Sequence, residues 1–143
     1  MYENMAEVKI KSLDHIGIAV KNIEDHIPYY RDILKLEYLG TKIVESQKIK
    51  TAIFKISEET VIEVFQPTDS STSIAKFIEK RGEGLHHICF GVTNIEEALE
   101  QAKSNNIKLI NETPFIGAKG LKVAFLHPSS TGKVLTEFTE IKS

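Results

Sequence analysis

The chain has 143 residues, of which 41% are hydrophobic and 27% charged, a composition typical of one globular domain with a real core. Its net charge of −2 and the lack of a basic stripe argue against nucleic acid as a partner. Cys89 is the one cysteine, which excludes an intrachain disulfide and predicts a buried thiol. No stretch reaches the roughly 18 apolar residues that span a bilayer, and the polar start does not resemble a signal peptide, so we expect a cytoplasmic protein without membrane contact.

The sequence contains one segment twice. Residues 13–27 read LDHIGIAVKNIEDHI and residues 85–99 read LHHICFGVTNIEEAL, and seven of the fifteen aligned positions are identical. Each copy predicts a strand with a large apolar face, opposite a face that bears a histidine and small residues. Asn22 and Asn94 then predict helix N-caps with acidic first turns. Pro28 predicts a bend or a tightened first turn in the first helix.

Three strands are predicted after each helix. In the first half they cover roughly Glu37–Val44, Ile49–Ile56 and Thr60–Phe65. The stretch Ser71–Lys80 predicts a short helix that joins the halves. In the second half the helix stops near Ser104, and strands are expected over roughly Lys108–Glu112, Leu121–Leu126 and Lys133–Thr139.

These elements predict an α+β fold of two tandem βαβββ modules, whose curled mixed sheets form a metal-containing cleft. We expect residues 1–143 to make a single domain, with module one over about 11–67, a linker helix over about 71–81 and module two over about 84–141.

Four side chains predict a metal site. His15 and His87 lie 72 residues apart, and Glu63 and Glu137, each amid apolar strand residues, lie 74 apart. A buried carboxylate without partners costs several kcal/mol or takes up a proton, which favours a ligand role. Two imidazoles and two carboxylates suit a divalent cation and leave its identity open. Each histidine alone reads as a satisfied core residue and each glutamate as a solvent-facing one, but their recurrence in both halves favours the metal site.

The remaining histidines predict structural roles. His86 falls on the opposite strand face from His87, His127 stands beside Pro128 at a turn, and His26 is expected on a helix surface.

Three segments resemble the vicinal oxygen chelate (glyoxalase, bleomycin resistance and dioxygenase) superfamily, and within it the methylmalonyl-CoA epimerase family. They are LDHIGIAVKNIED near the start, SIAKFIEKRGEGLHHICFGVTNIEEAL in the middle and KVAFLHPSSTGKVLTEFTE at the end. The resemblance covers roughly Leu13–Glu140, and its middle and last segments are the most specific to the epimerases.

The resemblance implies one divalent metal ion (Co, Zn, Mn or Ni) held at His15, Glu63, His87 and Glu137 in a vicinal oxygen chelate fold. It implies an isomerase that interconverts (2R)- and (2S)-methylmalonyl-CoA by proton abstraction at C2 through an enolate, with an acyl-CoA as its partner and a homodimeric assembly. Such a reaction needs a base on one face of C2 and a proton donor on the other.

The second proton carrier is where the chain departs from the family. The family's Pro-Glu-Gln-Gly-like segment reads Val44-Glu45-Ser46-Gln47-Lys48, with Ser46 at the glutamate's place. Some members have an inward acid where this chain has Thr51. Glu137 is therefore the first catalytic candidate, as both a metal ligand and a proton carrier, and Glu45 the second.

Two other functions stay open. A glyoxalase I-type isomerase (lactoylglutathione lyase) would use the same ligands on a thiol hemithioacetal, and a non-catalytic small-molecule-binding protein of this fold would need none of them. Lys119, Lys122 and Lys133 lie near the expected cleft, where they suit either CoA phosphates or simple solubility.

Overall fold

The computed structural model describes residues 7–142, and its chain divides into two compact units. The first-repeat unit spans His15–His86, and the second-repeat unit comprises the described residues up to Asp14 and those from His87 onward. The start of the chain, from which no signal peptide was expected, lies largely outside the described residues. Among the described residues no helix is long and apolar enough to cross a membrane.

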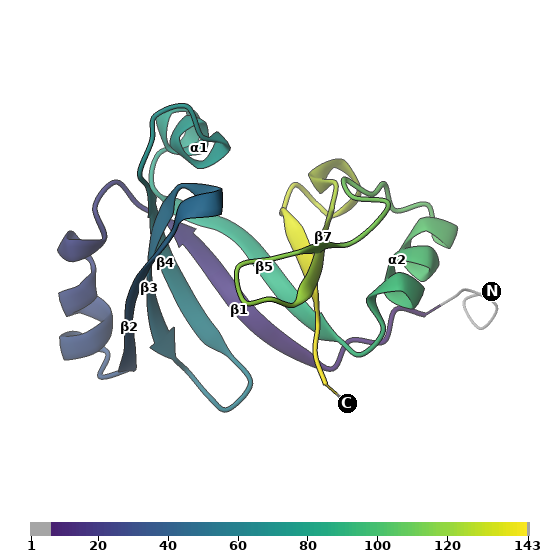
Figure 1. The fold of residues 1–143 in the computed structure, drawn as a ribbon, viewed down its shortest axis with the longest axis horizontal. Coiled ribbons are helices and arrows are strands. Elements are labelled where there is room, and N and C mark those ends of the chain that lie inside the picture. Colours follow the sequence, from purple (N-terminus) through teal and green to yellow (C-terminus); the bar gives the residue numbers. More distant parts are fainter. Residues whose placement is uncertain (1–6, 143) are drawn as a thin grey trace. The chain divides into compact units, whose positions relative to one another are not determined.

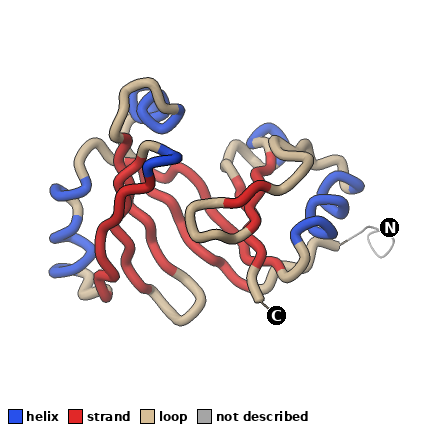
Figure 2. The backbone as a smooth tube through the Cα atoms, in the orientation of Figure 1, coloured by secondary structure: helices blue, strands red, loops and turns tan. Residues whose placement is uncertain are grey.

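The first-repeat unit carries the strand order β2-β3-β4-β1 (Figures 1 and 2). Its elements are β1 (Ser12–Ala19, entering the unit at His15), the 3₁₀ turn η2 (Ile23–Asp25), the π-helical turn η3 (Tyr29–Ile33), β2 (Glu37–Val44), the 3₁₀ turn η4 (Glu45–Gln47), β3 (Ile49–Lys55), β4 (Val61–Pro67) and α1 (Ser73–Arg81). β1 runs parallel to β4, and β3 is antiparallel to both β2 and β4.

The two faces of this unit differ because side chains alternate along each strand. One face holds Phe54, Val64 and Val20, which pack with Ile23 and Ile27 from the segment after β1 to form a core. The other, which we call the His15 face, carries His15 and Gly17 on β1, Glu63 and Phe65 on β4, Thr51 and Ile53 on β3, and Lys42 on β2. Ile78 of α1 packs against Phe65 at one end of this face.

The second-repeat unit carries the strand order β5-β8-β7-β6. Its elements are β5 (Gly84–Val92, entering the unit at His87), α2 (Ile95–Ser104), β6 (Phe115–Ile116), β7 (Lys122–Leu126), the 3₁₀ turn η5 (Pro128–Ser130) and β8 (Thr136–Glu140). Ile95, Leu99 and Ala102 of α2 pack on Phe138 and Ala124, so α2 covers one face of the strands. The opposite face, the His87 face, carries His87 and Cys89 on β5, Glu137 on β8, Phe125 on β7 and Phe115 on β6.

The two units use the same strand registers. Glu63 on β4 pairs with Gly17, two residues after His15. Glu137 on β8 pairs with Cys89, two residues after His87. Each unit therefore sets its glutamate at the same strand position relative to its histidine. The sequence shows this equivalence only approximately, because the two histidines lie 72 residues apart and the two glutamates 74.

The helix starts follow the predicted caps. The Asn94 side chain accepts a hydrogen bond from the backbone N–H of Glu97 (3.0 Å) at the start of α2, and Asn22 accepts one from Glu24 (3.2 Å). The first repeat makes no long helix. Pro28 separates the 3₁₀ turn η2 from the π-helical turn η3, which confirms the expected irregularity there.

Two strand predictions in the second half need correction. The stretch Lys108–Glu112 is not a strand, because only Leu109 forms an isolated bridge, to Leu126, and the edge strand lies later at β6. The last strand begins at Thr136 rather than Lys133. Lys133 has a left-handed backbone (φ 71°), which ends the turn after η5 and cannot continue a strand.

Candidate metal centre

The first-repeat unit brings His15 and Glu63 together. The Nδ1 atom of His15 lies 3.7 Å from the Oε2 atom of Glu63. His15 is 7% exposed, and the Glu63 side chain is 17% exposed, so both are largely removed from water. Gly17, which has no side chain, lies directly opposite Glu63, and His15 stands two residues earlier on β1.

The second-repeat unit brings His87 and Glu137 together in the same way. The Nε2 atom of His87 lies 3.3 Å from the Oε1 atom of Glu137, and both residues are 8% exposed. The ring of Phe125 meets the His87 ring edge-on (centroids 6.2 Å apart, planes at 80°). The apolar ring limits solvent on one side of the imidazole, so its interaction with the carboxylate is screened less than it would be at the surface.

The chemistry of the two pairs fits a divalent cation. Each pair presents an imidazole nitrogen and a carboxylate oxygen, the donors that Zn, Co, Ni and Mn sites share. A buried carboxylate needs a positive partner, which either a protonated histidine or a metal ion supplies. The predicted ligands therefore pair within each unit, and Glu63, the least buried of the four, is nevertheless part of a pair.

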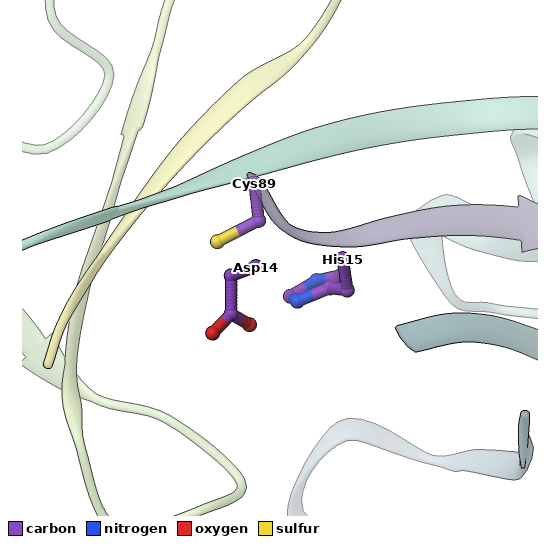
Figure 3. A group of neighbouring side chains, drawn as sticks. All are labelled: Asp14, His15 and Cys89. Carbon is purple, nitrogen blue, oxygen red and sulfur yellow. The ribbon is translucent and has the colours of Figure 1, made fainter. Parts of the chain in front are cut away.

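Cys89 lies opposite Glu137 in the second-repeat unit, and Asp14 belongs to the same unit. Figure 3 shows the Asp14 carboxylate and the Cys89 thiol together with His15, the residue after Asp14. Asp14 and Cys89, both of the second-repeat unit, offer ligand atoms within 4.8 Å of each other. Cys89 is fully buried, as predicted, and Lys119 reaches Asp14 (Nζ to Oδ2, 3.8 Å). The ammonium of Lys119 thus partly balances the charge of Asp14.

Glu45 and Thr51, the positions that bear on the second acid or base, differ in their surroundings. Glu45 lies in the exposed 3₁₀ turn η4, directly after β2, and is not part of a strand. Thr51 lies on β3 and is 3% exposed, on the same face as Glu63. Lys42 lies opposite Thr51 on β2, and in the sequence it is only one polar residue of the predicted strand Glu37–Val44.

The remaining histidines have the structural places that the sequence predicts. His86 meets the rings of Phe65 (5.4 Å) and Phe77 (4.9 Å) edge-on, and burial lowers its pKa from 6.5 to about 4. His127 caps η5, where its Nδ1 accepts a hydrogen bond from the Ser129 N–H (3.0 Å). His26 follows η2 and lies 3.4 Å from the Glu83 carboxylate.

Two of the three lysines suggested for CoA lie near carboxylates of their own unit. Lys119 reaches Asp14, and Lys122 reaches Glu96 (2.8 Å). Lys133 is exposed in the turn before β8. Surface pairing thus accounts for Lys119 and Lys122 without a bound phosphate.

Comparison with known proteins agrees with the fold. Residues 14–125 match the family model of the glyoxalase/bleomycin resistance protein/dioxygenase superfamily. An ethylmalonyl-CoA/methylmalonyl-CoA epimerase of Cereibacter sphaeroides is 34% identical over 134 residues, covering 92% of this chain and 99% of the relative.

Solved structures give the same result. A hypothetical protein from Bacillus halodurans C-125 has a TM-score of 0.86 at 50% identity, covering 92% of this chain and 94% of its own. A variant of Streptomyces coelicolor methylmalonyl-CoA epimerase in complex with 2-nitronate-propionyl-CoA has a TM-score of 0.85 at 28% identity, covering 92% and 95%. The expected α+β vicinal oxygen chelate fold is confirmed, and the chain belongs to the glyoxalase/bleomycin resistance protein/dioxygenase superfamily.

Proposed function

We propose that this protein is a metal-dependent epimerase that interconverts (2R)- and (2S)-methylmalonyl-CoA. The observation that carries the proposal is the buried His–Glu pair at the same strand register in both units. Epimerase relatives that span nearly the whole chain supply the substrate class. A cytoplasmic homodimer remains our prediction for its location and assembly.

We further propose that His15, Glu63, His87 and Glu137 hold one divalent ion, whether Co, Zn, Mn or Ni. The donor set supports this, because two imidazoles and two carboxylates complete four positions and leave others for substrate oxygens. Such an ion, when bound, acts as a Lewis acid on the thioester and carboxylate oxygens and stabilises negative charge there.

Within this proposal Glu137 moves the proton. Its carboxylate takes the C2 proton, the C2–H electron pair passes into the thioester to form the enolate, and the carboxylate becomes a carboxylic acid. Inversion then needs a proton delivered to the opposite face of C2. Glu45 is our candidate for that donor, because it lies in the exposed turn directly after β2 and is the carboxyl group nearest in sequence to the glutamate that the family resemblance leads us to expect. The Nε2 atom of His87 and the Oε1 atom of Glu137 lie 3.3 Å apart, so the two proposed ligands stand side by side.

The alternative function is a glyoxalase I-type isomerase, which would use the same four ligands; Thr51 stands where the family resemblance led us to expect an acid, so the chain lacks that second proton carrier. A glyoxalase I-type isomerase moves a proton between neighbouring carbons with one carboxylate, and therefore needs no second acid. Such an enzyme would use Glu137 alone.

Deuterium exchange separates the two reactions. We would incubate the Co²⁺-loaded protein with (2S)-methylmalonyl-CoA in D₂O and follow deuterium at C2, beside an assay with methylglyoxal and glutathione. The epimerase predicts exchange that His87→Ala abolishes and that His127→Ala retains, because the His127 side chain caps the turn η5 and is not a proposed ligand. Turnover of the hemithioacetal without C2 exchange would replace the epimerase by the isomerase, and inactivity in both assays would reject both enzymes.

Proton transfer by Glu137 and Glu45 is tested in the same assay. Glu137→Gln should abolish exchange. Glu45→Gln should allow C2 deuterium uptake in the starting epimer while slowing formation of the other epimer, because only delivery to the opposite face is lost. Full epimerisation by Glu45→Gln would exclude Glu45 as the second proton carrier.

A further inference from the structure

Beside the His15–Glu63 pair, the His15 face carries a second polar pair. Thr51 on β3 lies directly opposite Lys42 on β2, and opposite Phe65 on β4. Directly opposed residues of antiparallel strands place their side chains on the same face, about 5 Å apart at Cβ. Glu63 pairs with Ile53, so Thr51 is its diagonal neighbour on this face.

The hydroxyl of Thr51 is buried without a hydrogen-bond partner. Thr51 is 3% exposed, and its Oγ1 atom makes no hydrogen bond among the described residues. Removing a hydroxyl from water without replacing its hydrogen bonds is unfavourable, so an orphaned hydroxyl is uncommon and needs an explanation. Lys42, in contrast, is exposed. The pair therefore runs from the interior of the His15 face to its exposed margin.

The fold itself does not require these two polar residues. In the second-repeat unit Val123 lies opposite Thr139 on β8 and Phe115 on β6, as Thr51 lies opposite Phe65 and Lys42. Val123 is buried, and Phe115 stacks on Phe125 (centroids 6.3 Å apart). Apolar side chains thus satisfy the same strand positions in the other repeat, and the hydroxyl and the ammonium are particular to the first.

We propose that Lys42 and Thr51 form a carboxylate-binding subsite, which holds the free carboxylate of the ligand beside the His15–Glu63 pair. The assignment of that ligand as a malonyl-type CoA thioester rests on the proposed function. The ammonium offers charge and three donors, and the hydroxyl offers one further donor to the other carboxylate oxygen. A threonine hydroxyl does not titrate near neutral pH, so Thr51 binds the substrate and carries no proton.

Two CoA thioesters that differ in one carboxylate test the subsite. Methylmalonyl-CoA, as an equilibrated mixture of epimers, and propionyl-CoA, which lacks the carboxylate, are titrated calorimetrically into the Co²⁺-loaded protein. Lys42→Met and Thr51→Val should each lower the affinity for methylmalonyl-CoA at least tenfold. The affinity of each variant for propionyl-CoA should change less than twofold. Thr51→Ser should restore binding to near the wild-type value.

The same two strands offer matched controls on the opposite face. Lys50 precedes Thr51 on β3 and pairs with Glu24 (3.5 Å), and Thr41 precedes Lys42 on β2 and bonds the Tyr38 hydroxyl. Lys50→Met and Thr41→Val remove the same ammonium and hydroxyl without touching the subsite, so both should bind the two thioesters as the wild type does.

The results of these titrations test the subsite separately from the proposed epimerase reaction. Equal affinity of the wild type for both thioesters would overturn the subsite. So would an equal loss of affinity for both thioesters in Lys42→Met and Thr51→Val. A thermal midpoint of unliganded Thr51→Val below that of the wild type would assign the hydroxyl a structural role and likewise overturn it. If Lys42 and Thr51 are needed for tighter binding of methylmalonyl-CoA than of propionyl-CoA, the subsite is supported. If the same protein shows no deuterium exchange at C2 in D₂O, the epimerase is rejected.

Discussion

Acidification should destabilise the metal-free protein through His86. The folded pKa of His86 is about 4 against an ordinary 6.5, because burial disfavours the charged ring. The unfolded chain then binds the proton more tightly, so the stabilisation is complete above pH 6.5 and is lost as the pH falls toward 4. Linkage gives a loss of about 2 kcal/mol between about pH 7.5 and about pH 5 from this group alone.

The assay compares urea unfolding of wild type and His86→Phe at both pH values, with chelator present. Phenylalanine preserves the aromatic contacts with Phe65 and Phe77 and removes the titrating ring. All other titrating groups are the same in both proteins. The difference between the two proteins in how the free energy of unfolding changes with pH therefore gives the contribution of His86. The wild type should lose about 2 kcal/mol more than the variant. Equal losses would refute the assignment of a buried, neutral His86.

Three further predictions concern the second-repeat unit. Asn94→Ala should lower the free energy of unfolding by about 1 kcal/mol, since it removes the cap of the Glu97 N–H, and urea unfolding that shows no loss would contradict this. Phe138→Ala should cost about 3–5 kcal/mol, because the 3% exposed ring fills the core under α2; a loss below about 1 kcal/mol would show that the core is not packed there. Lys122→Met should leave the thermal unfolding midpoint unchanged despite the 2.8 Å contact of Lys122 with Glu96, because the pair is exposed, and a clear fall of that midpoint would contradict a surface role.

The repeat explains how much of the fold the sequence predicts. Identical residues at equivalent places predict two copies of one strand, and the near-equivalent positions of Glu63 and Glu137 predict ligands of one metal ion together with His15 and His87. The contacts within each His–Glu pair come from the structure. The second copy diverges most between α2 and β7, where Lys108–Glu112 has strand-like residues but pairs only at Leu109. Strand formation there depends on a partner, which local sequence does not specify.

Residues whose role depends on a cross-strand partner are harder to predict. Thr51 appears in the sequence only as a mismatch to an expected acid, and Lys42 as one of many surface lysines. Their pairing depends on the register of β2 against β3, which shifts between Tyr38 and Gly40. A one-residue irregularity of this kind moves side chains between faces, so the sequence alone does not place Lys42 on the His15 face.

We propose that one metal ion is held by His15, Glu63, His87 and Glu137. Measuring bound metal per chain after Co²⁺ loading and dialysis tests it directly, in wild type, His15→Ala, His87→Ala and the control His127→Ala. We expect one ion per chain in the wild type and in the control, and none in His15→Ala or His87→Ala. Two ions in the wild type, or one ion retained when either His15 or His87 is replaced, would contradict a shared site.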